Sequence, residues 1–592
     1  MSDRRKTTQG RAGKSAGTGA VYTVSITDLS NLGYGVGRLP ADGDVPGASD
    51  AGSGAVGKVI FVRGAVTGDT VETAVIKETA GYLVGRLVRV VTPSPLREPA
   101  QFCTAPEACG GCVFRHLTYA AELESKHRRV QSAFRQAGLA DVRVLPPLST
   151  GRTAGYRNKG MYPVQAGRNG MQAGFYAAKS HRLIPCADCA LQPPAFAGVV
   201  GTVCRFCDRE HLPAYDETTG AGILRHIYLR TTAAGEIMVC LVINADGLPG
   251  GRAAEARLVD CLLAEQPRTV SVLLNINRRN TNVVLGEQYR KLYGSGWIED
   301  TLCGLRFRLS AGSFYQVNRE GAELLYETAA RMAEVRGGES LWDLYCGAGT
   351  IGLSMLSPGR NARPAQVTGV EIVPEAVACA EQNARLNAEA GRIPPDAAHF
   401  FCADAGDAAA LFAAADTGAA PAPDIVIIDP PRKGTTPELI RELARRGVSR
   451  VVYVSCDPET LARDCALFRA SGYAVGEVQP VDMFPRTGHV ETVCLLSKLQ
   501  SKEHIEIEVT MDEMDLTSAE SKATYEEIRE YVFGHTGLKV SHLYIAQVKQ
   551  KYGIIERENY NKPKSENAKQ PQCPPEKEKA ITEALKHFGM IL

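Results

Sequence analysis

A series of apolar segments between residues 341 and 456, each followed by a turn or an acidic residue, constrains the fold most. Leu341-Trp-Asp-Leu344 leads into Tyr345-Cys-Gly-Ala-Gly349, a Gly-x-Gly turn that opens a helical pattern. Later apolar runs end at Glu371, Asp404 and Asp429. Strands that alternate with helices form a parallel sheet, and ligands collect at the carboxyl edge of its strands. The sequence therefore predicts an α/β domain whose acidic residues meet at one site.

The glycines and the first of these acids indicate the kind of ligand. Glu371 follows the Gly-x-Gly turn by about twenty residues, the spacing at which an acid meets a ribose in dinucleotide-binding folds. The turn lacks the third glycine of the dinucleotide fingerprint. We therefore expect an enzyme that binds a nucleoside cofactor smaller than a nicotinamide dinucleotide.

Cys456 lies where another apolar run, Val451–Ser455, meets a predicted helix. Asp457 can cap that helix, and Pro458 suits its first position. The partial positive charge at a helix N-terminus favours a thiolate, and a thiolate is a nucleophile. Taken alone, the position also suits a buried structural cysteine. The neighbouring cofactor motifs favour the nucleophile.

Length and charge set broad limits. A chain of 592 residues is long enough for about three to five domains. The net charge of +1 neither requires nor excludes nucleic acid, because a basic groove can lie within a balanced total. No apolar run reaches about eighteen residues, and no apolar segment follows the basic N-terminus. We expect a monomeric cytoplasmic protein with no membrane partner.

The 17 cysteines are unevenly spaced, which argues against a disulfide framework. Three of them form a C-x5-C-x2-C arrangement: Cys103, Cys109 and Cys112. Such a set places three thiolates around one point, as in zinc and iron–sulfur sites. Cys186 and Cys189 are candidates for a fourth ligand, and spacing alone favours zinc. Chance clustering is the alternative, and the further C-x2-C pair Cys204 and Cys207 is either a rival site or no site at all.

The N-terminal region predicts a barrel. Residues 1–20 are rich in Gly, Ser, Thr and basic side chains, which is typical of a disordered arm. Four β-rich runs divided by glycines follow, at Val21–Ile26, Val56–Val62, Thr70–Ile76 and Leu83–Val90. Their spacing predicts a small closed β-barrel. Barrels of the oligonucleotide-binding kind often bind RNA on one face, although a purely structural role fits this segment equally.

The region from about Val142 to Leu309 mixes β-rich runs with connecting helices. Two of its segments combine cations with aromatic side chains: Gly155-Tyr-Arg-Asn-Lys159 and Leu224-Arg-His-Ile-Tyr-Leu-Arg230. Such combinations suit single-stranded RNA, because bases stack on rings while Arg and Lys hold phosphates. Solvated surface charge is the alternative explanation.

Five motifs follow one another between residues 313 and 492. They are Ser313-Phe-Tyr-Gln-Val-Asn318, Asp343-Leu-Tyr-Cys-Gly-Ala-Gly349, Asp429-Pro-Pro-Arg432, Ser455-Cys-Asp-Pro458 and Gly488-His-Val-Glu-Thr492. Together they resemble the RNA uracil-5-methyltransferase family, and most of all its branch that modifies bacterial 23S ribosomal RNA. The resemblance covers about residues 20–498 and implies that residues 21–91 are an RNA-binding TRAM barrel.

The resemblance implies a reaction and the residues that perform it. S-adenosylmethionine would methylate C5 of a uridine after the thiolate of Cys456 adds to C6. Glu491 matches the base that removes the C5 proton so that the cysteine can leave. The positions that match contacts to the methyl donor are Gln316, Tyr345, Thr350, Glu371, Asp404 and Asp429. Thr350 departs from the usual family pattern. The target base must leave its stack to reach the cysteine.

The resemblance also changes the expected metal. The cysteines that match ligands of a [4Fe–4S] cluster in this branch are Cys103, Cys109, Cys112 and Cys189. Cys189 is preferred to Cys186 because the family places its fourth cysteine just before a short Leu-Gln-Pro-like segment. The cluster thereby replaces zinc as the first expectation, and zinc remains the alternative.

The predicted architecture has five parts. They are a disordered arm (1–20), a TRAM β-barrel (21–91), a central α/β RNA-binding domain with the cysteine motif (92–310), a Rossmann-like methyltransferase domain (311–498) and a C-terminal extension (499–592). Three helices are predicted in the extension, at Ala519–Val532, Val540–Lys551 and Glu576–Phe588. This extension lies outside the resemblance, and its role stays open.

We expect 23S ribosomal RNA as the substrate, and a transfer-RNA uracil methyltransferase is the alternative. A non-catalytic RNA-binding or assembly protein is a third possibility. The presence of both Cys456 and Glu491 argues against it.

Overall fold

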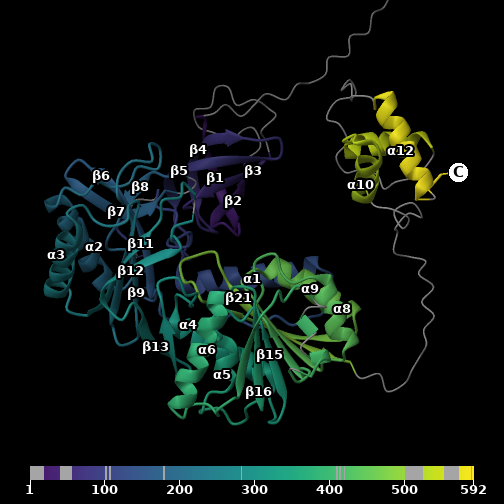
Figure 1. The fold of residues 1–592 in the computed structure, drawn as a ribbon. Helices are drawn as coiled ribbons and strands as arrows, with labels where there is room; N and C mark the ends of the chain where they lie inside the picture. The colour runs from purple at the N-terminus through teal and green to yellow at the C-terminus, as the bar shows by residue number, and fades with distance from the viewer. Residues whose placement is uncertain are drawn as a thin grey trace, which may run out of the picture. The chain divides into compact units, whose positions relative to one another are not determined.

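The computed structural model describes residues 19–39, 57–99, 103–105, 108–177, 180–281, 283–407, 411–412, 415–418, 420–499, 525–552, 573–588 and 590–591. All but the last two residues of the predicted N-terminal arm lie outside these ranges. The chain divides into two compact units, Met1–Gln500 and Ser501–Leu592 (Figure 1). None of the described helices has the length and apolar character needed to cross a membrane.

A closed five-stranded barrel forms the N-terminal part of the first unit. Its strands are β1 (Val21–Leu29), β2 (Tyr34–Arg38), β3 (Val59–Arg63), β4 (Thr70–Glu78) and β5 (Tyr82–Thr92). Alternate side chains of β1 point inward, so Tyr22, Val24 and Ile26 are buried between exposed neighbours. The predicted barrel is therefore present.

Strand β2 was not predicted, because its sequence Tyr-Gly-Val-Gly-Arg contains two glycines, which usually interrupt strands. The barrel requires them. A Cβ atom on Gly37 would lie 2.5 Å from Val24 Cγ1, and one on Gly35 would lie 2.8 Å from Ala65 Cβ. The glycines allow the closely packed interior that a small barrel needs.

Helix α1 (Tyr119–Gln136) follows the cysteine-rich segment. It packs against α9 (Pro458–Ala470) and β20 (Tyr473–Val481) of the predicted methyltransferase domain. Val130 and Phe134 of α1 are buried in the core of that domain. The helix thus joins the N-terminal region to the elements that carry the site.

The central region is a seven-stranded sheet in the order β12-β11-β10-β9-β6-β7-β8. Its strands are β6 (Lys159–Gly167), β7 (Gly170–Tyr176), β8 (Leu183–Pro185), β9 (Leu224–Thr231), β10 (Ile237–Ile243), β11 (Thr269–Ile276) and β12 (Gln288–Gly294). Helices α2 (Pro194–Arg209) and α3 (Gly251–Glu265) pack together on one face. Every residue of β10 is buried, which explains its continuous apolar sequence. The hairpin of β13 (Ile298–Leu302) and β14 (Leu305–Leu309) follows.

A second seven-stranded sheet, which is called the catalytic sheet because it lies in the predicted methyltransferase domain, has the order β17-β16-β15-β18-β19-β21-β20. Its parallel strands are β15 (Ser340–Leu344), β16 (Gln366–Glu371), β17 (Ala398–Cys402), β18 (Ile425–Ile428) and β19 (Arg450–Ser455). Strands β20 and β21 (Glu491–Lys498) form an antiparallel pair beside β19. The strand order reverses between β15 and β18, and ligands of open α/β sheets bind at such a switch point.

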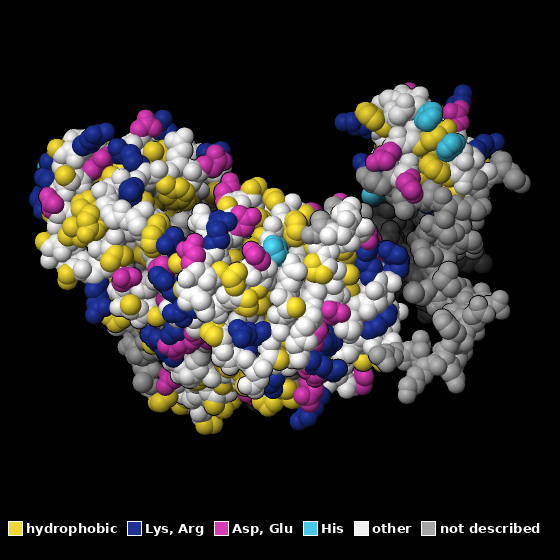
Figure 2. Space-filling view, turned by 60° about the horizontal axis from the view of Figure 1, so that its bottom comes forward, with side chains coloured by type: hydrophobic (Ala, Val, Ile, Leu, Met, Phe, Trp, Pro, Cys, Tyr) yellow, Lys and Arg dark blue, Asp and Glu magenta, His cyan; other side chains and the backbone are white. Residues whose placement is uncertain are grey.

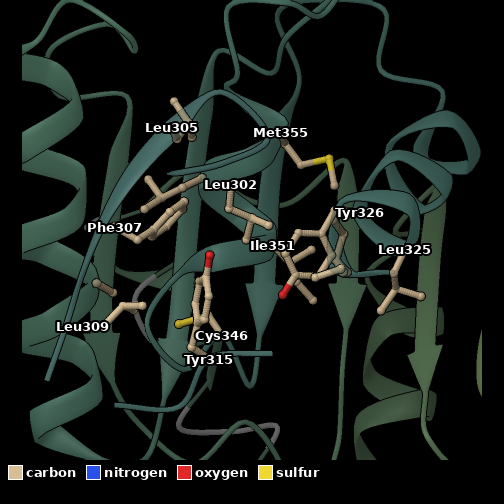
Figure 3. Packing of buried hydrophobic residues seen from close by; sticks show 14 of the residues in the cluster. Leu302, Leu305, Phe307, Leu309, Tyr315, Leu325, Tyr326, Cys346, Ile351 and Met355 are labelled. Atoms are coloured by element: carbon tan, nitrogen blue, oxygen red, sulfur yellow. The ribbon is translucent and has the colours of Figure 1, made fainter. Parts of the chain in front are cut away.

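Helices cover both faces of this sheet. Helices α4 (Arg319–Ala333), α5 (Thr350–Met355) and α6 (Pro374–Glu389) contribute to the buried cluster on one face, and α8 (Pro437–Arg445) and α9 to the cluster on the other. Figure 3 shows side chains of the first cluster, in which Tyr326, Ile351 and Met355 lie close together. Cys346 of the glycine turn and Tyr315 also belong to this cluster, so the turn is anchored in the core.

The second unit contains three described helices: α10 (Tyr525–Thr536), α11 (His542–Lys551) and α12 (Pro575–His587). They share a core that includes Ile528, Val532, Ile545, Ile581 and Leu585. All three predicted helices are found, although the start predicted for the first one lies outside the described residues.

Candidate active site

A cavity of about 1200 Å³ lies at the carboxyl edge of the catalytic sheet. Six of the eight residues predicted for catalysis or methyl-donor binding line it: Gln316, Tyr345, Glu371, Asp429, Cys456 and Glu491. Five of them lie at or next to the ends of β15, β16, β18, β19 and β21, and Gln316 precedes α4. The structure therefore brings together residues that are up to 175 positions apart in the sequence.

The other two predicted residues, Thr350 and Asp404, do not line this cavity. Thr350 is the buried first residue of α5, and its hydroxyl lies 3.0 Å from that of Tyr326. Asp404 is exposed after β17, where it accepts a hydrogen bond from the Gly406 N–H at 2.8 Å. Burial raises the pKa of Tyr345, and the charge of Asp404 adds to this effect. Asp404 thus lies near the cavity. Thr350 follows the glycine turn and contacts Tyr326 of α4 instead of the cavity.

Two carboxylates hold the glycine turn after β15. Glu371 accepts hydrogen bonds from the N–H groups of Gly347 at 3.1 Å and Val373 at 3.0 Å. Asp343 accepts one from the Gly352 N–H at 2.7 Å and is fully buried, which raises its pKa to about 7. Asp343 was not predicted as a site residue, although it begins the glycine motif. It fixes the turn without lining the cavity.

Tyr345 has an unusual backbone conformation. Its φ angle is +63°, in the left-handed region that residues other than glycine rarely adopt. Its hydroxyl lies 3.5 Å from the Thr435 hydroxyl, in the turn that follows β18. Strained residues concentrate at functional sites when the surrounding structure holds them. The conformation is consistent with a binding role for Tyr345.

Gln316 lies in a segment that the central sheet holds in place. Asn158 donates a side-chain hydrogen bond to the Gln316 carbonyl at 2.9 Å and a backbone one to the Val317 carbonyl at 2.7 Å. Asn318 caps α4 through the Gly321 N–H at 3.0 Å. Both the central sheet and the catalytic sheet therefore build the wall of the cavity.

The local structure at Cys456 is the one that the sequence predicts. Strand β19 ends at Ser455, and Asp457 caps α9 by accepting a hydrogen bond from the Thr460 N–H at 3.0 Å. The prediction that the helix end favours the thiolate of Cys456 is wrong for the protein without bound ligands. Burial and the charges of Glu491 and Asp429 raise the pKa of the Cys456 thiol to about 11. These effects outweigh the partial charge of the helix end.

Glu491 and Asp429 both line the cavity, and the charge of Asp429 influences the ionisation of Glu491. Burial raises the pKa of Asp429 to about 7. Burial and the charge of Asp429 raise the pKa of Glu491 to about 8, and Arg432 opposes the shift. Near neutral pH, Glu491 therefore holds a proton for much of the time and exchanges it in the physiological range. Perturbed carboxyl groups beside a thiol are typical of a catalytic site.

A buried ion network fixes the loop that precedes Glu491. Lys126 of α1 donates hydrogen bonds to Glu122 and Asp482, both at 2.7 Å. Glu122 also accepts a hydrogen bond from the Arg486 N–H at 2.7 Å. All four side chains are buried, so the network resists displacement by water. Helix α1 thereby sets the position of the loop at the start of β21.

Three cations of the cavity wall were not predicted as site residues: Arg157, Lys159 and Arg432. Burial and the charges of Arg230 and Arg157 lower the pKa of Lys159 to about 8. The segment that carries Arg157 and Lys159 had been noted for its mixture of cations and rings, and this mixture was the available signal. On the face that Figure 2 shows, Lys and Arg are interspersed with Asp and Glu. The net charge of the chain agrees with that pattern.

A second cavity, of about 300 Å³, is lined by cysteines of two segments: Cys103, Cys109, Cys112, Cys186 and Cys189. Both candidates for a fourth ligand are present. Within the described part of the chain, however, no group of three or more His, Cys, Asp or Glu side chains is placed so that it could hold a metal ion. The rival pair Cys204 and Cys207 lies on α2 and packs into the core of the central sheet.

Comparison with known proteins agrees with this arrangement. Residues 224–499 match the family model described as tRNA (Uracil-5-)-methyltransferase, and residues 17–88 match that of the TRAM domain. An uncharacterized RNA methyltransferase of Halalkalibacterium halodurans is 35% identical over 478 residues, which are 80% of this chain and 96% of that one. One of Clostridium acetobutylicum is 34% identical over 483 residues, or 81% and 97% of the two chains.

A solved structure is also similar to the chain. The tRNA (uracil-54, C5)-methyltransferase of Pyrococcus abyssi, in complex with S-adenosyl-L-homocysteine, superimposes with a TM-score of 0.60 at 25% identity. The match covers 80% of this chain and 99% of that one. The fold and the site define an RNA methyltransferase. The chain belongs to the RNA uracil-5-methyltransferase family and carries a TRAM domain.

Proposed function

We propose that this enzyme transfers a methyl group from S-adenosylmethionine to C5 of a uridine in RNA through a covalent adduct with Cys456. The observation that carries the proposal is the shared cavity. Cys456 and Glu491 line the same space as Glu371 and the glycine turn. A nucleophile, a titratable carboxyl and a nucleoside site are the three parts that the reaction needs.

The residues divide the reaction between them. The Cys456 thiolate forms a bond to C6 of the flipped uracil, and the electron pair of the C5=C6 bond shifts toward the C4 carbonyl, which leaves an enolate with a nucleophilic C5. S-adenosylmethionine, when bound, supplies the electrophilic methyl group for C5. Glu491 in its ionised form then takes the C5 proton, the double bond reforms and Cys456 leaves as a thiolate. Gln316, Tyr345, Glu371 and Asp429 would hold the donor, with Thr350 and Asp404 in support.

The high pKa of the Cys456 thiol predicts a pH dependence. Below a pKa of about 11, the thiolate fraction rises up to about tenfold for each pH unit. The rate constant for adduct formation with a 5-fluorouridine RNA should therefore increase steadily between pH 7 and pH 9, measured by rapid quenching and denaturing gels. A flat profile would show that the thiol is already ionised, as the helix end alone would predict.

We propose 23S ribosomal RNA as the substrate, because the cysteine motif and the barrel resemble that branch of the family. One observation favours transfer RNA instead: the similar solved structure is named a tRNA (uracil-54, C5)-methyltransferase. Methylation of transcripts of both RNAs, followed by mapping of 5-methyluridine, decides between them. Modification of transfer RNA alone would overturn the ribosomal assignment, and absence of 5-methyluridine in both would overturn the activity.

We further propose that the cysteine-lined cavity holds a [4Fe–4S] cluster through Cys103, Cys109, Cys112 and Cys189, with zinc as the alternative. Four thiols of two segments around one cavity suit either group. The group would tie the segment before α1 to the segment after β8. As they stand in the described part of the chain, these thiols do not form a group that could hold a metal ion.

Anaerobic purification tests the cluster. The protein should be brown, absorb broadly in the visible range and contain iron and sulfide, whereas Cys189→Ser should lose most of both. Cys204→Ser on α2 is the matched control and should keep them. A colourless protein with stoichiometric zinc would establish the alternative.

A further inference from the structure

Arg157 and Lys159 are two cations for which the described part of the chain offers no carboxylate partner. Both side chains are half-buried, and neither forms a salt bridge with an Asp or Glu among the described residues. Lys159 is paired across the sheet with another cation, Arg230, whose guanidinium donates to the Tyr228 hydroxyl at 2.8 Å and to the Ser313 carbonyl at 2.7 Å. Partial burial of unpaired like charges is unfavourable unless an anion joins them.

The two cations lie where the two cavities meet. Arg157, Lys159 and Thr487 line both the active-site cavity and the cysteine-lined cavity. Glu371 and Asp429, acids proposed for the donor site, line only the active-site cavity. The cations therefore lie in the part of the active-site cavity that adjoins the cysteine-lined cavity.

Their backbone is held firmly. Lys159 opens β6 and pairs with Arg230 of β9, and Arg157 forms an isolated bridge with Asn318 at the start of α4. The charge of Arg157 also contributes to the lowered pKa of His489, which places it near the loop that leads to Glu491. Groups on rigid elements can hold a ligand with a defined geometry.

We propose that Arg157 and Lys159 bind the RNA phosphate next to the flipped target uridine. The inference rests on the proposed function and specifies how that site takes its substrate. Flipping rotates the nucleotide about its backbone, so the adjoining phosphates must lie against the cavity wall. Phosphate contacts of Arg and Lys position a nucleic acid without reading its sequence. The unpaired charges would thus order the backbone and leave base recognition to other residues.

Salt dependence of RNA binding tests the proposal. Affinities of the full-length protein for an RNA that it methylates are measured at several salt concentrations, with S-adenosylhomocysteine present. The variants are Arg157→Gln and Lys159→Met, and the control is Arg252→Gln, which removes an exposed cation on α3. Each lost phosphate contact should reduce the slope of log K against log salt by about 0.7, and the control should keep the wild-type slope.

A chemically altered RNA makes the test independent of folding. A single neutral methylphosphonate replaces the phosphate on the 5′ or the 3′ side of the target uridine. One of the two should weaken binding to the wild type about tenfold or more, and should weaken binding to the Arg157→Gln and Lys159→Met variants much less. This non-additivity is expected only if the cations contact that phosphate.

Other results would overturn the assignment. If the variants weaken S-adenosylhomocysteine binding and keep the RNA salt slope, the anion is the amino-acid carboxylate of the donor. If wild type and variants respond equally to both methylphosphonates, the cations touch no adjoining phosphate. With both of these results, the proposed function stands as long as the wild type methylates the RNA. If the wild type makes no 5-methyluridine, the proposed function itself is refuted.

Discussion

Replacing Cys456 by alanine should reduce methyl transfer to RNA by at least about a thousandfold, because the substitution removes the atom that activates C5. RNA binding should change little, since the thiol is one contact among many. The measurement is transfer of radioactive methyl groups to RNA, together with an affinity determination on the same samples. Loss of activity without loss of binding would assign Cys456 to the chemical step.

Cys402→Ala is the matched control. Cys402 is also at the carboxyl edge of the catalytic sheet, at the end of β17, but it is exposed and does not line the cavity. This variant should keep wild-type activity. A Cys456→Ala enzyme that retained more than about a tenth of the wild-type rate would show that the reaction needs no covalent adduct at this residue.

Glu491→Gln should stop the reaction one step later. Glutamine keeps the shape of the side chain but cannot take the C5 proton, so the methylated uridine should remain attached to Cys456. A denaturing gel of enzyme with unmodified RNA and S-adenosylmethionine should show a covalent complex that accumulates, while free 5-methyluridine falls by about a hundredfold or more. The exposed Glu477→Gln, on β20, should behave as the wild type.

The same variant should be more stable than the wild type in alkaline solution. The pKa of Glu491 is about 8 in the folded protein, above its ordinary value of 4.5. The folded state then binds more protons than the unfolded state between these values, so this group lowers stability as the pH rises from the lower value through the higher one. Glutamine removes that penalty, so a higher Tm at pH 9 is expected.

For the catalytic role, a Glu491→Gln enzyme that releases product normally would exclude Glu491 as the base.

Local sequence signals sufficed to bring together the residues proposed as the nucleophile and the donor site. A strand that runs into a capped helix places Cys456, and parallel strands bring their carboxyl ends together wherever they lie in the chain. Glu371 and Asp429 are therefore found in one cavity from patterns that span only a few residues each. The family resemblance added Glu491, which is the first residue of an ordinary apolar strand and has no local signal of its own.

Properties that depend on distant neighbours could not be predicted. The pKa of Cys456 depends on its burial and on Glu491 and Asp429, which reach it from other strands. Lys159 belongs to the central sheet and Arg157 lies just before it, and contacts between distant segments, such as those of Asn158 with the segment before α4, bring both to the cavity. Strand β2 was missed because its glycines serve close packing across the barrel, which no local pattern shows.

The central claim is that Cys456 forms a covalent bond with the target uridine. In 5-fluorouridine RNA the fluorine at C5 replaces the proton that the base would remove, so the adduct cannot resolve. Mass spectrometry of the digested complex, formed with S-adenosylmethionine, should find a methylated fluorouridine on the peptide that contains Cys456, and none with Cys456→Ala. An adduct on another residue, or no adduct although the wild type methylates uridine RNA, would contradict the account.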